Sequence, residues 1–494
     1  MSTAAPPAPA SRSGGAVLTA RLAAMMFLQF FLWGSWYVST GNFVLNGSGW
    51  ADAERINGYV YSLAPLAAIL SPLFLGAVAD RFFPSERVLG ILMLLGAACM
   101  AAVPSVLGGP DAGSAGDSFL ALVGAHAGYL GLLLLHCLCF MPTLGLTNTV
   151  AFSHLTDPEK QFPVVRVFGT LGWIVGTILV SKWEDLFGAA DWVGGADLEK
   201  SPGQYYVTAA ASAALGVYAF TLPHTPPPAK GQKAGVGDLL GFGAASMLKS
   251  RDFAVFLLAS TLLCVPLAGY YGFAAGFLGA SGFEDAGFSM SFGQMSEVGF
   301  MLLMPLAFAR LGVRWMLAAG MAAWVLRYAL FSGGADGGLL DADGPGGVKW
   351  MLLFGVILHG ICYDFFFVTG QIYTEKAAPA GLRGQAQGLL VLMTQGVGLL
   401  AGALLFGQLT GAYTTGVLGP DGEPVLNDAG KAVTETDWAS VWVWPCVAAA
   451  VILVVFLALF RPAADRPAIT PDTPGDGPRE PGPGTGGVPA EGLG

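Results

Sequence analysis

Residues 438–460 read WASVWVWPCVAAAVILVVFLALF and contain no charged side chain. A helix of about 20 apolar residues is long enough to cross the roughly 30 Å hydrocarbon core of a bilayer. Eleven further apolar runs precede this one, at 20–41, 58–79, 87–107, 120–152, 163–183, 204–222, 252–278, 288–309, 313–333, 349–374 and 384–412. The sequence therefore predicts an all-α membrane protein with twelve transmembrane helices.

The composition of the whole chain supports a membrane protein. Of its 494 residues, 54% are hydrophobic and only 11% are charged, which is too little charge to cover a soluble globule of this size. The net charge of −10 comes mainly from acids in polar loops and in the tail, and the 23 Lys and Arg are scattered through short loops. Nucleic-acid binding is excluded because it requires a basic stripe with exposed aromatic residues.

A polar, proline-containing linker at 223–251 divides the runs into two groups of six. We expect a short segment at 1–18, an N-terminal six-helix bundle at 19–222, a C-terminal six-helix bundle at 252–461, and a disordered Pro/Gly-rich tail at 462–494. Short cytoplasmic segments carry an excess of Lys and Arg. Only five cations fall on the side opposite the termini, namely Arg55, Lys182, Lys200, Lys349 and Lys431. Both termini are therefore expected in the cytoplasm.

Two six-helix halves joined by a cytoplasmic linker are the arrangement of the major facilitator superfamily, whose halves rock about a site at the bilayer midplane. Gly76, Asp80 and Arg81, between the second and third runs, resemble the glycine, aspartate and arginine motif of that superfamily. Small residues in this motif let helices approach, while the carboxylate can interact with a helix terminus. The resemblance implies the major facilitator fold.

Small residues inside the runs are interpreted as packing residues. All six cysteines lie within apolar runs, where they behave as small hydrophobes, so we expect no disulfide, metal site or cofactor. The pairs Gly172/Gly176 and Gly398/Gly402 are spaced by one helical turn and predict close contacts between helices.

Charged groups inside the apolar runs are candidates for function, because charge is costly in hydrocarbon. Asp364 lies about fifteen residues into its run, where desolvation neutralises an unpartnered carboxylate, so it is a candidate proton carrier; a permanent ion pair is the alternative. Gln294 and Glu297 are one turn apart and could present an amide and a carboxylate to one ligand, or form interhelical hydrogen bonds. Arg327 is interpreted as a packing residue.

A second polar face is predicted on the fifth run. Arg166, Thr170 and Trp173 recur at helical spacing, so a cation, a hydroxyl and an indole share roughly one face and could line a cavity. The alternative is an interfacial arginine that extends toward the headgroups. Tyr271 and Tyr363 are further candidates, because a buried hydroxyl requires a hydrogen-bond partner.

Segments in both halves resemble the nucleoside:proton symporter family of the major facilitator superfamily. They are Phe27–Trp36, Met141–Thr149, Phe162–Gly172, Thr221–His224, Gln294–Glu297, Trp324–Arg327 and Tyr363–Phe366. By similarity, the resemblance implies a site formed by Arg166, Thr170, Trp173, Gln294, Glu297, His359, Tyr363 and Asp364. The sequence departs from the family pattern in having Trp173 where phenylalanine is expected, His359 where some members have tyrosine, and Ala268 and tyrosines where amides are expected.

The predicted function is therefore import of nucleosides with protons by alternating access. Arg166, Thr170, Trp173, Tyr271, Gln294, Glu297, His359 and Tyr363 are the predicted substrate contacts, and Asp364, Glu297 and Arg166 the proton-coupling residues. The expected partners are a nucleoside, protons and the lipid bilayer of a bacterial inner membrane, with the protein acting as a monomer. A sugar or oligosaccharide:proton symporter is the nearest alternative. A nontransporting sensor and a membrane-embedded enzyme are less favoured, and we expect no enzymatic activity.

Overall fold

The computed structural model describes residues 12–50, 52–74, 83–107, 119–156, 158–188, 197–227, 242–340, 348–379, 382–426 and 433–462. Within these ranges the chain is almost entirely helical, as the sequence predicts. Among the described residues, nine helical segments are long and apolar enough to cross a membrane. The predicted Gly76, Asp80 and Arg81 motif lies outside the described residues, as do 1–11, the central part of the linker and 463–494.

The N-terminal helices follow the first six predicted runs. They are α1 (Arg12–Tyr37), α2 (Ser39–Asn42), η1 (Phe43–Gly47), α3 (Ala53–Phe74), α5 (Ser85–Ala102), η3 (Val103–Val106), α6 (Phe119–Ala125), α7 (Ala127–His154), α8 (Pro158–Ser181), α9 (Trp183–Phe187), η6 (Leu198–Lys200) and α10 (Gly203–Ala219). Helix α8 begins two turns before Arg166, so this arginine lies within the helix and not at its first residue.

The remaining helices follow the other six runs. They are η7 (Phe242–Lys249), α12 (Arg251–Ala280), α13 (Ala286–Gly334), α14 (Lys349–Ile357), α15 (His359–Tyr363), η8 (Asp364–Val368), α16 (Thr369–Ala377), α17 (Arg383–Val391), η10 (Leu392–Gly398), α18 (Leu399–Ala412) and α19 (Trp438–Leu459). The 49 residues of α13 contain two predicted runs, and the backbone leaves helical geometry between them at Gly312, where φ is 67°. Glycine tolerates this left-handed conformation.

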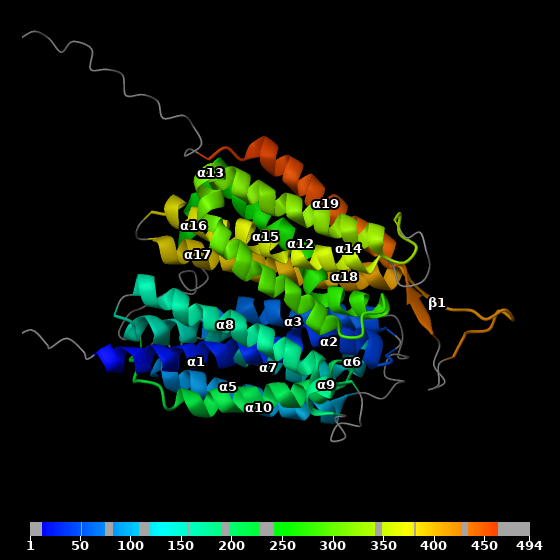
Figure 1. The fold of residues 1–494 in the computed structure, drawn as a ribbon, viewed down its shortest axis with the longest axis horizontal. Coiled ribbons are helices and arrows are strands. Elements are labelled where there is room, and N and C mark those ends of the chain that lie inside the picture. Colours follow the sequence, from blue (N-terminus) through cyan, green and yellow to red (C-terminus); the bar gives the residue numbers. More distant parts are fainter. Residues whose placement is uncertain are drawn as a thin grey trace, which may run out of the picture.

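The helices pack as two groups that lie against each other (Figure 1). In the N-terminal half α1 packs along α8, α5 packs along α10, and α3 and α5 both contact α7. In the C-terminal half α13 packs against α19, and α12 against α18. The halves meet where α3 contacts α18 and where α8 contacts α13. The α8 and α13 contact is the one that positions the site, because the two predicted polar faces lie on these helices.

Glycines explain how closely some helices approach. A Cβ on Gly172 would lie 2.1 Å from the carbonyl oxygen of Phe27, and one on Gly176 would lie 2.4 Å from that of Phe31. Any side chain at these positions would therefore separate α8 from α1. The predicted contact at Gly398 and Gly402 is also confirmed, since a Cβ at either would lie 2.5 Å from a carbonyl oxygen of α12.

The two ends of the molecule differ. Strand β1 (Thr414–Gly416) pairs antiparallel with β2 (Thr434–Thr436), and this hairpin projects from one end, which we call the hairpin end (Figure 1). Helix α1 begins and helix α19 ends at the opposite end, which we call the terminal end. There the backbone N–H of Arg461 donates to Oδ1 of Asp252 at 3.2 Å, which joins the ends of the C-terminal half.

Candidate functional site

The polar face predicted on α8 lies beside α1. The Arg166 guanidinium carbon is 4.3 Å from the centroid of the Phe30 ring, a cation–π contact. Thr170 and Trp173, one and two turns further along α8, are partly buried. The close approach of α8 and α1 at Gly172 holds this face in position, so the aromatic segment Phe27–Trp36 of α1 becomes part of the same site.

Trp173 lies in a cluster of aromatic rings. Its ring centroid is 5.1 Å from that of Trp33 and 6.2 Å from that of Tyr37, both in edge-to-face geometry. Its indole Nε1 is buried and has no hydrogen-bond partner. Because buried N–H groups normally find an acceptor, this donor is suited to a ligand.

Tyr271 connects the two halves. Its ring centroid lies 6.2 Å from that of Tyr37 in the N-terminal half and 6.2 Å from that of His359 in the C-terminal half. Tyr363 lies 5.8 Å from His359 on the other side. The predicted aromatic residues of spans five, seven and ten are thus brought together across the contact between the halves.

The most direct polar contact of the site joins α13 to α15. Oε1 of Glu297 lies 3.0 Å from Nε2 of His359, and the two side chains are 16% and 2% exposed. The His359 ring also stacks on Tyr270, with centroids 5.0 Å apart and planes at 21°. Both the hydrogen bond and the stacking fix the imidazole, and hence the direction of the Glu297 carboxylate.

Arg327 packs against Tyr270, the residue on which His359 stacks. Its guanidinium carbon lies 4.0 Å from the Tyr270 ring centroid, and its Nε donates to the carbonyl of Gly355 at 3.0 Å. The residue is fully buried among helices of its own half. These contacts fit the predicted packing role of Arg327, and they connect it through Tyr270 to His359.

Asp364 is fully buried, and neither of its carboxylate oxygens has a hydrogen-bond partner. It begins the π-helical turn η8, a local deviation that is frequent at functional sites. Gln294 is also buried, with Oε1 lacking a partner. A buried carboxylate and a buried amide without partners are expensive to maintain, which is typical of groups that bind a proton or a ligand.

Electrostatic interactions run across the halves. Arg166 on α8 interacts with Glu297 on α13 and with Tyr363 on α15. Asp364 interacts with Glu297. Asp364 has no hydrogen-bond partner among the described residues, so the permanent ion pair considered as its alternative role is not formed in this structure.

Sequence reasoning did not single out Trp33, Tyr37 and Phe30 as site residues, although the first and last fall in a segment quoted for the family resemblance. Helical spacing on α1 could not identify them, because the segment in which they lie is rich in large apolar and aromatic residues on all sides. His136, on α7, is a packing residue, with its Nδ1 3.1 Å from the Gly96 carbonyl oxygen and its ring 5.7 Å from that of Trp36. All six cysteines are free.

Comparison with known proteins agrees with the segments noted in the sequence. Residues 16–465 match the model of the nucleoside H+ symporter family. The chain is 37% identical over 447 residues to the transporter YegT of Escherichia coli (strain K12), covering 90% of this chain and 94% of that protein. It is 30% identical over 455 residues to the xanthosine permease of the same organism, covering 89% of this chain and 95% of that protein.

A solved structure has the same architecture. The crystal structure of the nucleoside transporter NupG superposes with a TM-score of 0.71 at 28% identity, covering 90% of this chain and 99% of that one. The superposition confirms the predicted major facilitator fold. The likeness to the peptide transporter PepTSo, at 13% identity and a TM-score of 0.63, shows the fold alone. The chain belongs to the nucleoside H+ symporter family.

Proposed function

We propose that the protein carries a nucleoside and a proton across the membrane in the same direction by alternating access. The observation that supports this most is that rings of the two halves meet at Tyr271, which lies 6.2 Å from Tyr37 and 6.2 Å from His359, the partner of Glu297. A site shared by two halves is what a rocking carrier requires. The family membership and the names of the relatives point to the same activity.

The residues of the site have the chemistry that a nucleoside needs. A nucleoside is uncharged, flat at its base and rich in hydroxyls at its ribose. The rings of Trp173 and Tyr271 suit the base, while the unpartnered oxygen of Gln294 and the carboxylate of Glu297 suit hydroxyl or amino donors. A single guanidinium, Arg166, is too little positive charge for a strongly anionic substrate.

Asp364 is the proposed proton carrier. Its carboxylate is buried without a hydrogen-bond partner inside a membrane-spanning helix, a placement typical of proton relays. In the proposed cycle Arg166 competes for the Asp364 carboxylate while the proton is absent, and protonation of Asp364 releases that pair. Substrate then bridges the halves between Thr170 and Trp173 on α8 and Gln294 and Glu297 on α13.

The proposed orientation places the terminal end in the cytoplasm and the hairpin end outside a bacterial inner membrane. The excess of cations in the sequence segments assigned to the terminal end supports this. The two halves of a single chain already contain every residue of the site, which supports a monomer as the transporting unit.

The test is uptake of labelled uridine by proteoliposomes with an imposed inward proton gradient. We expect accumulation that collapses with a protonophore, with competition by unlabelled nucleosides and none by maltose or glucose. Competition by sugars instead would favour the sugar:proton symporter, which the unexpected Ala268 and tyrosines of α12 leave as the nearest alternative. Binding of uridine without any uptake would indicate a sensor and overturn the proposed transport.

A further inference from the structure

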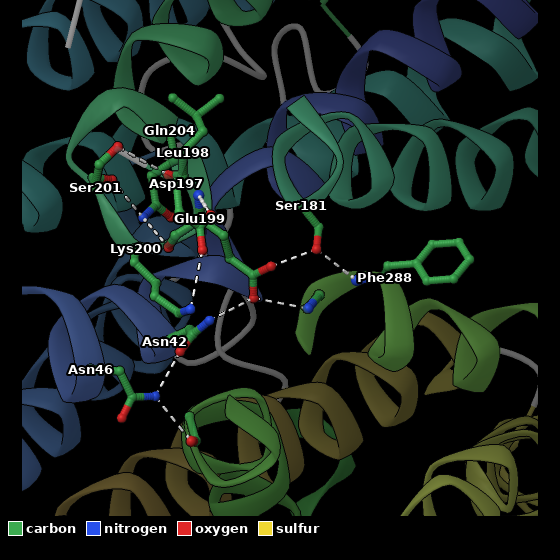
Figure 2. Close-up of polar contacts among 12 residues, drawn as sticks. Asn42, Asn46, Ser181, Asp197, Leu198, Glu199, Lys200, Ser201, Gln204 and Phe288 are labelled. Atoms are coloured by element: carbon green, nitrogen blue, oxygen red, sulfur yellow. Dashed lines mark hydrogen bonds and ion pairs between the residues drawn. The ribbon is translucent and has the colours of Figure 1, made fainter. Parts of the chain in front are cut away.

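A carboxylate is buried at the hairpin end, where the sequence predicts an exposed loop. Glu199 lies in the short helix η6, before α10, and is 1% exposed. Its side chain points away from its own loop toward the contact between the halves (Figure 2). An ionisable side chain is rarely buried unless its oxygens are fully hydrogen bonded, so its partners indicate what it does.

Glu199 binds both halves of the molecule. In the N-terminal half, Oε1 accepts from Asn42 Nδ2 at 2.8 Å, and Oε2 accepts from the hydroxyl of Ser181. In the C-terminal half, Oε1 accepts from the backbone N–H of Gly287 at 2.8 Å. The Ser181 hydroxyl in turn accepts from the backbone N–H of Phe288 at 3.0 Å. Figure 2 shows these contacts converging on one carboxylate.

Gly287 and Phe288 belong to the first turn of α13, where backbone N–H groups have no partner within the helix. Asp285, which precedes the helix, makes no side-chain capping hydrogen bond. Glu199 therefore supplies from the other half the capping that α13 lacks, and its negative charge suits the positive end of the helix dipole. In this closed arrangement the N-terminal half supplies the acceptors for the first turn of α13.

Two further contacts close the same end. Lys182, at the end of α8, forms an ion pair with Asp285, and Asn46 Nδ2 donates to the carbonyl of Gly276 at 3.0 Å. Lys182 is about one-quarter exposed, and an ion pair of this exposure contributes little to stability. The buried hydrogen bonds of Glu199 and Ser181 are consequently stronger connections to the start of α13 than this ion pair.

The same helix carries the transport site. Gln294 and Glu297 lie two and three turns beyond Gly287 on α13. A helix moves as a rigid rod over this length, so a displacement of its first turn displaces the site residues as well. The contacts of Glu199 are thus mechanically coupled to the side chains that hold the substrate.

We propose that Glu199 is a gating residue of the transport cycle, which holds the hairpin end closed: whenever that end opens, Glu199 must separate from Gly287, and the Ser181 hydroxyl from Phe288. This role rests on the proposed alternating access. Glu199 lies outside the proposed substrate site, and its effect on opening of the hairpin end can be measured without a transport assay.

The experiment measures access to the hairpin end directly. A Cβ on Gly276 would lie 2.3 Å from Cδ1 of Leu45, so these residues touch across the halves, and Leu45→Cys is a reporter of separation. Labelling by a membrane-impermeant maleimide is followed in right-side-out vesicles, with the chain lacking Leu45→Cys as the background for the six native cysteines. Four second-site variants are compared: Glu199→Ala, Glu199→Gln, Ser181→Ala and, as a matched control, the exposed Glu184→Ala.

We expect Glu199→Ala and Ser181→Ala to label at least about tenfold faster, because each leaves donors of α13 without acceptors in the closed state. Glu199→Gln should label no faster than the parent, since its amide can accept from Gly287 and donate to Ser181. Glu184→Ala should equal the parent. Parental labelling of both Glu199→Ala and Ser181→Ala would overturn the proposal. If Glu199→Ala does not fold, Ser181→Ala decides alone, and neither readout depends on whether nucleosides are the substrate.

Discussion

Glu297 and His359 form a hydrogen-bonded pair between α13 and α15, with Oε1 and Nε2 3.0 Å apart. His359 is also stacked on Tyr270, so substitutions that keep the stacking but differ in hydrogen bonding can test the contribution of the hydrogen bond alone. His359→Phe retains stacking and loses the donor, so we expect the initial rate of nucleoside uptake to fall by about tenfold or more. His359→Tyr offers both a ring and a hydroxyl and should keep most of the activity. Equal rates for the two variants would show that the hydrogen bond is not needed.

Asp364→Asn should abolish proton-driven accumulation while leaving exchange intact. Asparagine has almost the same shape as aspartic acid but cannot exchange a proton, so the carrier should still bind substrate and rock. The measurement is uridine accumulation under a pH gradient beside counterflow of labelled against unlabelled uridine. Gradient-driven accumulation at the parental level would rule out the proposed proton carrier.

Trp173→Ala should raise the KM for uptake by about two- to tenfold, since ring stacking is worth roughly 0.5–1.5 kcal/mol. Trp173→Phe retains a ring beside Trp33 and Tyr37 and should show a smaller rise. Saturation kinetics at fixed pH measures both variants. A KM that is unaltered in Trp173→Ala would place the substrate elsewhere.

Gly172→Ala should destabilise the protein, because a Cβ there would lie 2.1 Å from the carbonyl oxygen of Phe27 on α1. Overpacking of this kind costs about 1–3 kcal/mol and should appear as a lower Tm in detergent. Gly131→Ala on α7 is the matched control, since a Cβ there meets no atom within 4 Å. Equal Tm values for both variants would contradict the close contact of α8 with α1.

The closed hairpin end should become more stable as the pH falls. The pKa of Glu199 is raised to about 6, mainly by burial and also by the nearby Asp197 carboxylate, although hydrogen bonds from Ser181, Asn42 and Gly287 act to lower it. The other charged neighbours are paired, Lys200 with Asp197 and Lys182 with Asp285. When the end opens, Glu199 becomes solvated and its pKa returns toward the ordinary 4.5.

The closed state therefore binds the proton more tightly than the open state. Acidification through pH 6 favours closure by at most about 2 kcal/mol, and this gain is lost as the pH rises above 6. The measurement is the labelling rate of Leu45→Cys divided by that of the same reporter with Glu199→Gln, which removes the pH dependence of the thiol reaction. The ratio should fall on acidification. A ratio that stays constant from about pH 5 to 7.5 would contradict the proposed rise of the Glu199 pKa on closure.

Much of the candidate site could be proposed from the residue types alone. Asp364, Glu297 and Gln294 stand out because polar side chains are rare in the apolar runs, and helical spacing places Arg166, Thr170 and Trp173 on one face. The contributions of Trp33 and Tyr37 were not predictable in the same way. They are two aromatic residues in a run rich in them, and only the packing of α1 on α8 brings their rings to Trp173.

By itself the sequence determined that the chain is a helical membrane protein, where its helices run and which polar side chains in the apolar runs are candidates for function. The physical reason is that a bilayer permits few polar side chains and requires long apolar helices. Only the tertiary structure decided which helices are neighbours. That is why the partner of His359 and the burial of Glu199 came from it: one helix's periodicity specifies its own faces, whereas the atoms opposite each face are set by the packing of segments far apart in the chain.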